Sequence, residues 1–166
     1  MSTVQFIRDS MEASRRYTMH LLSDLRDTPL VQPTVNGGNH ALWIVGHLAT
    51  VEGMAIQGFM LNKPNPMAAH EHLFRMGSTP STDPTMYPGF DQLVKMYDDI
   101  RTQTYALLDT LTDADLAKTA PGCPEQFANW FGTYEKCLRS QVLHPLMHSG
   151  QAADIRLALG KERLMV

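Results

Sequence analysis

The sequence predicts an all-α protein, a four-helix bundle with one long crossover. Four long stretches carry apolar residues at intervals of three and four, which is the period at which one face of a helix repeats. No stretch alternates apolar and polar residues in the way that a half-buried strand does. Residues 64–88 contain five prolines, so a regular element is not expected there. This segment is the predicted crossover between the second and third helices of the bundle.

The first helix is predicted over residues 4–25. Its apolar stripe consists of Val4, Ile7, Met11, Thr18, Leu21, Leu22 and Leu25. Pro29 and Pro33, followed by residues 36–38 with the sequence Asn-Gly-Gly, end this helix and form a loop.

The second helix is predicted from His40 to Leu61. Asn39 is expected to cap it, because an asparagine side chain accepts a hydrogen bond from the first helical turn. The helix stops near Lys63 and Pro64. The residues that share its inner face are His40, Trp43, Ile44, His47, Val51, Met54, Gly58 and Leu61.

The third and fourth helices follow the crossover. The third begins near Gly89, and its stripe consists of Phe90, Leu93, Val94, Tyr97, Ile100, Leu107, Leu108 and Leu111. Residues 112–115 predict a turn or a short capped helix, and residues 121–124 predict a break. The fourth helical pattern runs from about Gln126 to Leu159, where Gly160 provides the C-cap.

Composition narrows the class of protein. With 166 residues, of which 43% are hydrophobic and 19% charged, the chain is expected to form a single domain over residues 1–166. No apolar run approaches the roughly 20 residues of a membrane span, and the N-terminus does not resemble a secretory signal, so we expect no membrane association and a cytoplasmic location. A net charge of -3 without a basic stripe argues against a nucleic-acid partner.

Familiar catalytic motifs are missing from the sequence. The chain contains no GxxxxGK[ST], GxGxxG or GxSxG pattern, which removes the usual signs of an NTPase, a dinucleotide enzyme or a serine hydrolase. Cys123 and Cys137 do not form a CxxC pair. We interpret them as reduced thiols, with a disulfide or a metal role as the less favoured alternatives.

Helical periodicity directs four of the seven histidines inward. His40 and His47 lie about 20° apart around the second helix, and His144 and His148 about 40° apart around the fourth. The second pair shares the apolar side of its helix with Trp130, Tyr134 and Cys137. The histidines interpreted as surface or loop residues are His20, His70 and His72.

Inward histidines have two interpretations. A histidine on an apolar face is commonly a hydrogen-bonded core residue, and a HxxxH pair on a helix also arises by chance. However, burying several imidazoles costs free energy unless each finds a partner, and one divalent cation satisfies three of them together. The zinc-protease pattern HExxH is absent, since Pro, Leu and Met occupy residues 145–147. Three histidines with one open coordination position form a catalytic type of site, whereas a structural site is usually closed by a fourth protein ligand.

Several segments together resemble the DinB-like (DinB/YfiT) superfamily. They are "GGNHALWIVGHLATVEG" at residues 37–53, "HLFRMGSTP" at 72–80, "YPGF" at 87–90 and "HPLMHSGQAADIRLALG" at 144–160. The most specific parts are WxxGHL in the second helix and HxxxHxGQ near the end. The resemblance extends over essentially the whole chain.

The resemblance implies an up-down-down-up four-helix bundle, often a homodimer, in which His47, His144 and His148 hold a divalent metal ion (Zn, Ni or Fe). Members of the superfamily include thiol transferases that use bacillithiol or mycothiol, and a mycothiol-dependent isomerase. The expected function is therefore a metal-dependent enzyme acting on a small-molecule substrate. Thiol-dependent transfer with a low-molecular-weight thiol is favoured, and metal-assisted hydrolysis comes next.

Two functions without catalysis remain open. The first is a bundle that binds a metal or another ligand in a stress response, and the second is a bundle whose histidines are structural and hold no metal.

Residues near the three histidines carry further expectations. Pro145 should kink or loosen the helix and re-aim His144. His40 either orients a ligand or substrate or simply begins its helix. Gln151 either lines the mouth of the site or is a surface amide. Arg156 is expected to pair with an acid, with an anionic group of a thiol cofactor as the alternative.

Glu52 lies about 140° from His47 around the second helix. That angle makes it a poor general base for the site.

Overall fold

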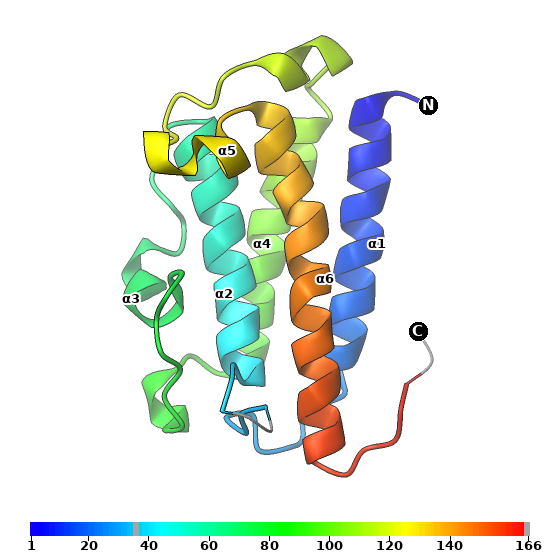
Figure 1. Cartoon of the computed structure of the whole chain (residues 1–166), viewed down its shortest axis with the longest axis vertical. Helices are drawn as coiled ribbons and strands as arrows, with labels where there is room; N and C mark the ends of the chain where they lie inside the picture. The colour runs from blue at the N-terminus through cyan, green and yellow to red at the C-terminus, as the bar shows by residue number, and fades with distance from the viewer. Residues whose placement is uncertain (35–36, 165–166) are drawn as a thin grey trace.

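A computed structural model describes residues 1–34 and 37–164 of the chain. Four long helices stand side by side: α1 (Thr3–Ser23), α2 (Ala41–Gly53), α4 (Phe90–Leu108) and α6 (Tyr134–Ala158) (Figure 1). Followed from the N-terminus to the C-terminus, α1 and α6 run downward in this view, whereas α2 and α4 run upward. The described part of the chain contains no strand, only an isolated bridge between Thr119 and Thr133. The all-α prediction is confirmed.

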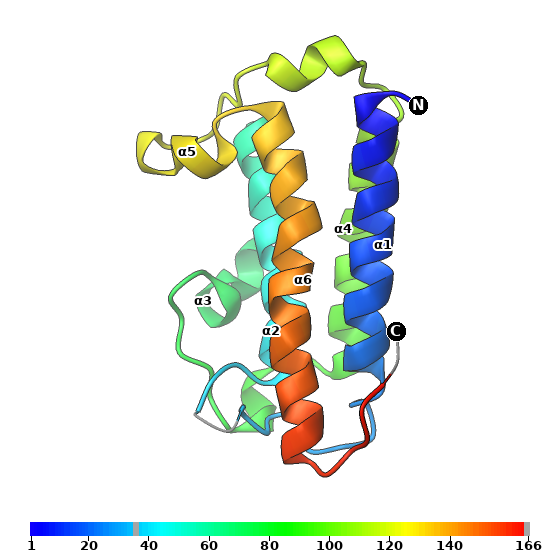
Figure 2. The ribbon, with the colours of Figure 1, turned by 45° about the vertical axis from the view of Figure 1, so that its right-hand side comes forward.

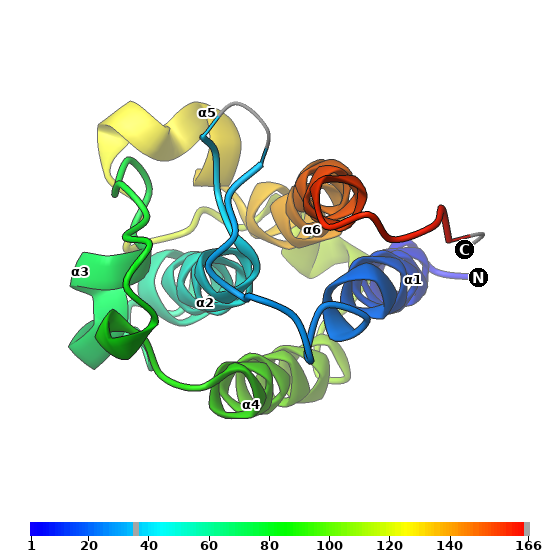
Figure 3. The same cartoon turned by 90° about the horizontal axis from the view of Figure 1, so that it is seen from below.

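The helices pack around the bundle in a definite order. α1 packs mainly against α6, and α2 packs mainly against α4, while α1 and α4 make few contacts with each other. An end-on view shows α2 and α6 as neighbours on the side that carries α3 (Glu71–Phe74) and α5 (Ala128–Phe131) (Figure 3). No helix in the described ranges is both long enough and apolar enough to cross a membrane.

The core has two apolar ends with a polar layer between them. One cluster includes Leu22, Ile44 and Ile155, and the other includes Met11 and Ile56. Between these clusters each long helix contributes buried polar side chains at its middle: Ser14 and Thr18 from α1, His47, Thr50 and Glu52 from α2, Arg101 and Thr104 from α4, and Gln141, His148 and Ser149 from α6. Buried polar groups need partners, so this layer is where a site can be expected.

The N-cap of α2 differs from the prediction. His40 takes this place, and its Nδ1 accepts a hydrogen bond from the backbone N–H of Trp43 at 3.2 Å. Asn39 instead donates its side-chain amide to Gln151 on α6 at 3.0 Å. A neutral imidazole nitrogen offers the same kind of acceptor as an asparagine oxygen, which is why a histidine serves as the cap. Of the preceding loop, Asn36 lies outside the described residues, and Gly37 has a positive φ of 74°.

The second helix is buried on all sides. Every residue of α2 is buried, which a single stripe does not predict. Its outer face is covered by the crossover, where the prediction that residues 64–88 form no regular element is wrong. The crossover contains η2 (Ala68–His70), α3 and η3 (Pro84–Met86). Met67 and Phe74 bury their side chains there, and a Cβ built on Gly46 would lie only 2.3 Å from the Phe74 ring. Burial of the Met67 and Phe74 side chains stabilises these short helices, which the proline content of the segment did not predict.

Two predicted helices are interrupted. The second continues past Gly53 as a π-helix, η1 (Met54–Met60), rather than as α-helix to Leu61. The fourth does not begin at Gln126, because α6 starts only after Thr133, whose side chain accepts a hydrogen bond from the N–H of Lys136. The shorter elements η4 (Asp113–Ala117) and η5 (Glu125–Phe127) precede it, together with α5. At the C-terminal end, Leu159 is the cap and Gly160 follows it with φ 70°.

Candidate three-histidine metal centre

Three histidine rings converge where α2 faces α6. His144 Nε2 lies 3.2 Å from His47 Nε2 and 3.0 Å from His148 Nε2. One ring nitrogen from each of the three lies within 4.8 Å of the other two. His47 and His148 are buried and His144 is half-buried. The structure thus brings together the three residues that the sequence singled out, although they come from helices almost a hundred positions apart.

The ring of His47 is fixed from two sides. Its Nδ1 lies 2.6 Å from the carbonyl oxygen of Phe74, so Nδ1–H donates and Nε2 keeps its lone pair. The indole of Trp43 stacks on the imidazole with ring centroids 4.2 Å apart. Trp43 is in turn held by its Nε1–H, which donates to Leu73 O at 3.1 Å and to Ser78 Oγ at 3.0 Å. The crossover thereby sets the orientation of a residue on α2.

The ring of His148 is fixed by an amide. Its Nδ1 lies 2.7 Å from Gln151 Oε1, and the same oxygen accepts from the side chain of Asn39. Nδ1–H therefore donates, and Nε2 carries the lone pair, as in His47. Gln151 is half-buried and orients one of the three histidines, so the alternative of a free surface amide is wrong.

His144 is left incompletely satisfied. Its Nδ1 is buried and finds no hydrogen-bond partner among the described residues, although its Nε2 faces two lone pairs. A proton on Nε2 can point at only one of these neighbours, and a proton on Nδ1 leaves three lone pairs facing one another. Either tautomer has a cost, since an unpaired buried polar group typically costs about 1–3 kcal/mol.

Electrostatics keeps all three rings neutral. Burial lowers the pKa of His47 to about 4, and the nearby His148 adds to this shift. Burial, together with His148 and His47, lowers the pKa of His144 to about 2. Burial also lowers the pKa of His148. The unprotonated nitrogens that a metal requires are therefore present at neutral pH.

A divalent cation fits this donor set. Three nitrogens bound at about 2.0–2.1 Å to one four-coordinate zinc ion lie about 3.3 Å from one another. The separations of 3.0 and 3.2 Å around His144 are close to that value. A cation would also remove the conflict among lone pairs that either tautomer of His144 leaves.

Other residues named from the sequence have different roles. His40 begins α2, and its Nε2–H donates to Ser81 O at 2.9 Å, so it supports the crossover and does not contact the three histidines. Arg156 pairs with Asp24 at 2.8 Å, which agrees with the favoured expectation, and this guanidinium and Lys161 lower the pKa of Asp24. Glu52 forms a buried ion pair with Arg101.

The kink expected at Pro145 stays a prediction, and the helix does not end there. α6 runs unbroken through Pro145, and the carbonyl of that proline accepts from Thr18 Oγ1 on α1 at 2.9 Å. His144 lies at the centre of the cluster rather than at a displaced edge. The predicted shared face with Trp130 is wrong, because α6 begins after this residue, and Trp130 lies on α5 with 70% of its surface exposed. Of the remaining histidines, His20 and His72 are exposed and His70 is half-buried.

Sequence reasoning missed the groups that hold the rings. The carbonyl of Phe74 carries no signal of its own, since a backbone oxygen is present at every position, and Asn39 was interpreted as a helix cap instead. Trp43 did carry a signal, because it shares the inner face of its helix with His47.

Comparisons with known proteins agree with this fold. No curated protein matches the chain. Among solved structures, a conserved protein from Enterococcus faecalis superposes with a TM-score of 0.74 at 17% sequence identity, over 97% of this chain and 99% of the other. That likeness concerns the fold alone. A sequence model described as the DinB superfamily matches residues 10–152, which include all three histidines. The chain belongs to the DinB superfamily.

Proposed function

We propose that His47, His144 and His148 bind one divalent cation, zinc, nickel or iron, and that the protein is a metal-dependent enzyme acting on a small molecule. Thiol-dependent transfer is the favoured reaction, and metal-assisted hydrolysis is the second. One observation carries the proposal: three neutral imidazole nitrogens from two helices lie within 4.8 Å of one another.

The residues of the protein would bind the cation and orient its histidine ligands. Phe74 O and Gln151 Oε1 hold the Nδ1–H groups of the two outer histidines, so that both Nε2 lone pairs point at the same place. When bound, the cation supplies Lewis acidity, lowering the pKa of a water or a thiol in its open position. Three protein ligands leave such a position, which favours a catalytic over a structural site.

Metal content tests the binding step. Protein purified without a histidine tag, from cells grown in metal-supplemented medium, should carry about one equivalent of a divalent metal, and His144→Ala should lose most of it. The matched control is His20→Ala, an exposed histidine on α1 that lies outside the cluster. Less than about 0.1 equivalent in the parent protein would overturn the proposal.

Turnover tests the catalytic step. The metal-loaded protein should consume at least one pair from a panel of low-molecular-weight thiols and electrophiles, or hydrolyse one of a panel of esters and amides. Activity should disappear in His144→Ala and persist in His20→Ala. Metal binding without turnover on either panel would contradict an enzyme and support the binding-protein alternative. The homodimer implied by the resemblance stays a prediction, which sedimentation velocity can test.

A further inference from the structure

An apolar cavity of about 470 Å³ adjoins the three-histidine cluster. Its lining residues come from α2, α6, η5, α5 and the crossover. Figure 2 shows α5 and the crossover projecting from the side of the bundle formed by α2 and α6. His144 forms part of the cavity wall. The apolar side chains that line it include Val51, Phe127, Trp130, Phe131, Leu143 and Met147.

The lining of this cavity carries no charged side chain among the described residues. Its polar members are Gln126, Ser140 and His144. A larger hollow of about 850 Å³ between α1 and α4 differs in this respect, since Arg15 and Asp98 line it and none of the three clustered histidines does. The cavity beside His144 therefore combines proximity to the candidate metal centre with an uncharged wall.

We infer that the substrate of the three-histidine site is a neutral, largely apolar small molecule that binds in this cavity against His144. This inference rests on the proposed function. Ligand cavities typically measure about 300–1,000 Å³ and hold their ligands mainly by apolar and aromatic contacts, with few polar groups. Away from the cation proposed at His144, a carboxylate or phosphate would lose its hydration here without meeting an arginine or lysine, which disfavours anionic groups on the part of the substrate that the cavity wall contacts.

The exposure of the lining residues agrees with an entrance for a ligand. Trp130 is 70% exposed, Met147 72% and Leu143 51%, although all three belong to the cavity wall. A ligand that covers these exposed apolar side chains removes their surface from water. The free energy of this burial is favourable in proportion to the apolar area covered.

The test measures binding of two probes of similar shape, 2-naphthol and 2-naphthoate, to metal-free protein by calorimetry. The neutral naphthol should bind at least about 10-fold more tightly than the carboxylate, because burying an unpaired charge is costly. Equal affinities, tighter binding of the carboxylate, or no binding of the naphthol would overturn the inference.

Two leucines of α6 provide a matched pair of variants. Leu143 and Leu157 are 51% and 50% exposed, but Leu143 alone of the two lines this cavity. Leu143→Ala should weaken naphthol binding by about 5-fold, through loss of apolar contact, whereas Leu157→Ala should leave it unchanged. An equal effect of both substitutions would overturn the placement of the ligand.

Cobalt places the probe relative to the histidines. Paramagnetic Co²⁺ added to the protein should broaden the proton resonances of bound naphthol, and diamagnetic Zn²⁺ should not. If naphthol binds but Zn²⁺ and Co²⁺ do not, the proposed function fails, and with it the assignment of the ligand as a substrate. If both metals bind and naphthol does not, only the present inference fails.

The alternative to a small molecule in this cavity is a second copy of the chain, which would cover the same apolar side chains. In that case naphthol affinity would fall as protein concentration rises, and Leu143→Ala would convert a dimer into a monomer in sedimentation velocity. That pair of results would overturn the inference.

Discussion

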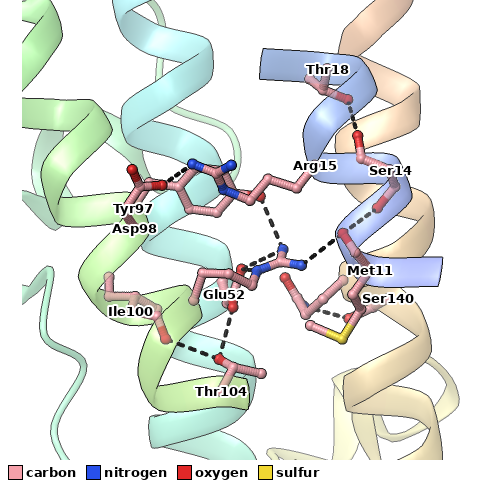
Figure 4. A network of polar contacts seen from close by, with 12 residues as sticks. Met11, Ser14, Arg15, Thr18, Glu52, Tyr97, Asp98, Ile100, Thr104 and Ser140 are labelled. Atoms are coloured by element: carbon pink, nitrogen blue, oxygen red, sulfur yellow. Dashed lines mark hydrogen bonds and ion pairs between the residues drawn. The ribbon is translucent and has the colours of Figure 1, made fainter. Parts of the chain in front are cut away.

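Two buried polar clusters occupy the middle of the bundle, and they differ in how completely the protein satisfies them. On the α2–α4 side, Glu52 accepts from Arg101 Nε at 2.9 Å and from Thr104 Oγ1 at 2.7 Å. Arg101 also donates to Met11 O at 3.1 Å and to Tyr97 Oη at 3.0 Å (Figure 4). On the α2–α6 side, three neutral histidines face one another, and His144 Nδ1 has no partner among the described residues.

The difference agrees with a structural role for the Glu52 cluster and with the binding role proposed for the histidine cluster. The Glu52 cluster contains both signs of charge, so Coulomb attraction and hydrogen bonds close it without any further group. In the histidine cluster three neutral rings face one another, and neither tautomer of His144 satisfies all of their nitrogens, which is the reason for the metal proposal. The two clusters are similarly buried, but we expect them to respond differently to substitution, to acid and to added metal.

The largest effect is expected when the ion pair of the Glu52 cluster is broken. Glu52→Ala leaves the guanidinium of Arg101 buried without its carboxylate and should lower the free energy of unfolding by about 3–5 kcal/mol. Urea denaturation measures this loss. The double variant Glu52→Leu with Arg101→Met should recover most of it, because no unpaired charge remains. A single-variant cost below about 1 kcal/mol would contradict the closed-cluster interpretation.

Acid should destabilise the metal-free protein through the histidine cluster. The pKa values of His47 and His144 are about 4 and about 2 in the folded state, below the ordinary histidine value of 6.5. Below about pH 6.5 the unfolded chain binds more protons at these positions, so stability falls as the pH drops toward 4 and is insensitive to these groups above pH 7. His47 alone contributes on the order of 3 kcal/mol to this decline.

Urea denaturation between pH 7 and pH 4 checks this expectation. His47→Gln should show a shallower decline than the parent protein, because a glutamine does not titrate. An unchanged slope would contradict the assignment of the decline to the histidine cluster.

Metal affinity should depend on the groups that orient the histidines. Gln151→Ala removes the acceptor for His148 Nδ1–H and should weaken Zn²⁺ binding by about 10- to 100-fold. Competition with a chromophoric chelator measures the affinity. The control is Gln92→Ala, an exposed amide on α4, which should bind Zn²⁺ as the parent does. Equal affinities for both variants would show that the orientation of His148 does not matter.

The smallest effect is expected at the unsatisfied histidine. His144→Leu removes the unpaired Nδ1 and replaces the ring with an apolar side chain, so metal-free protein should unfold within about 1 kcal/mol of the parent, or be more stable. Urea denaturation provides the comparison, with Glu52→Leu as the contrasting variant. A loss above about 2 kcal/mol would indicate that His144 is structural without metal.

Local patterns predicted the elements unevenly. The bounds of the first and third helices agree with their apolar stripes to within a few residues, since one face of each is buried and the other is in water. The extent of the fourth was wrong, because the apolar pattern continues through Gly132 and Thr133 while the chain turns there. The burial of α2 on all sides came from the crossover, whose short helices depend on Met67 and Phe74 finding a place against it.

The sequence by itself determined which histidines face inward, because side-chain direction follows helical period, and this selected four: His40, His47, His144 and His148. The family resemblance named the last three as metal ligands. Only the tertiary structure decided that their Nε2 atoms meet. Angular position on a helix does not specify the height at which two helices face each other or the rotation of a ring. Phe74 O and Gln151 set those rotations through hydrogen bonds. Those contacts exist only once the crossover and α6 have packed against α2.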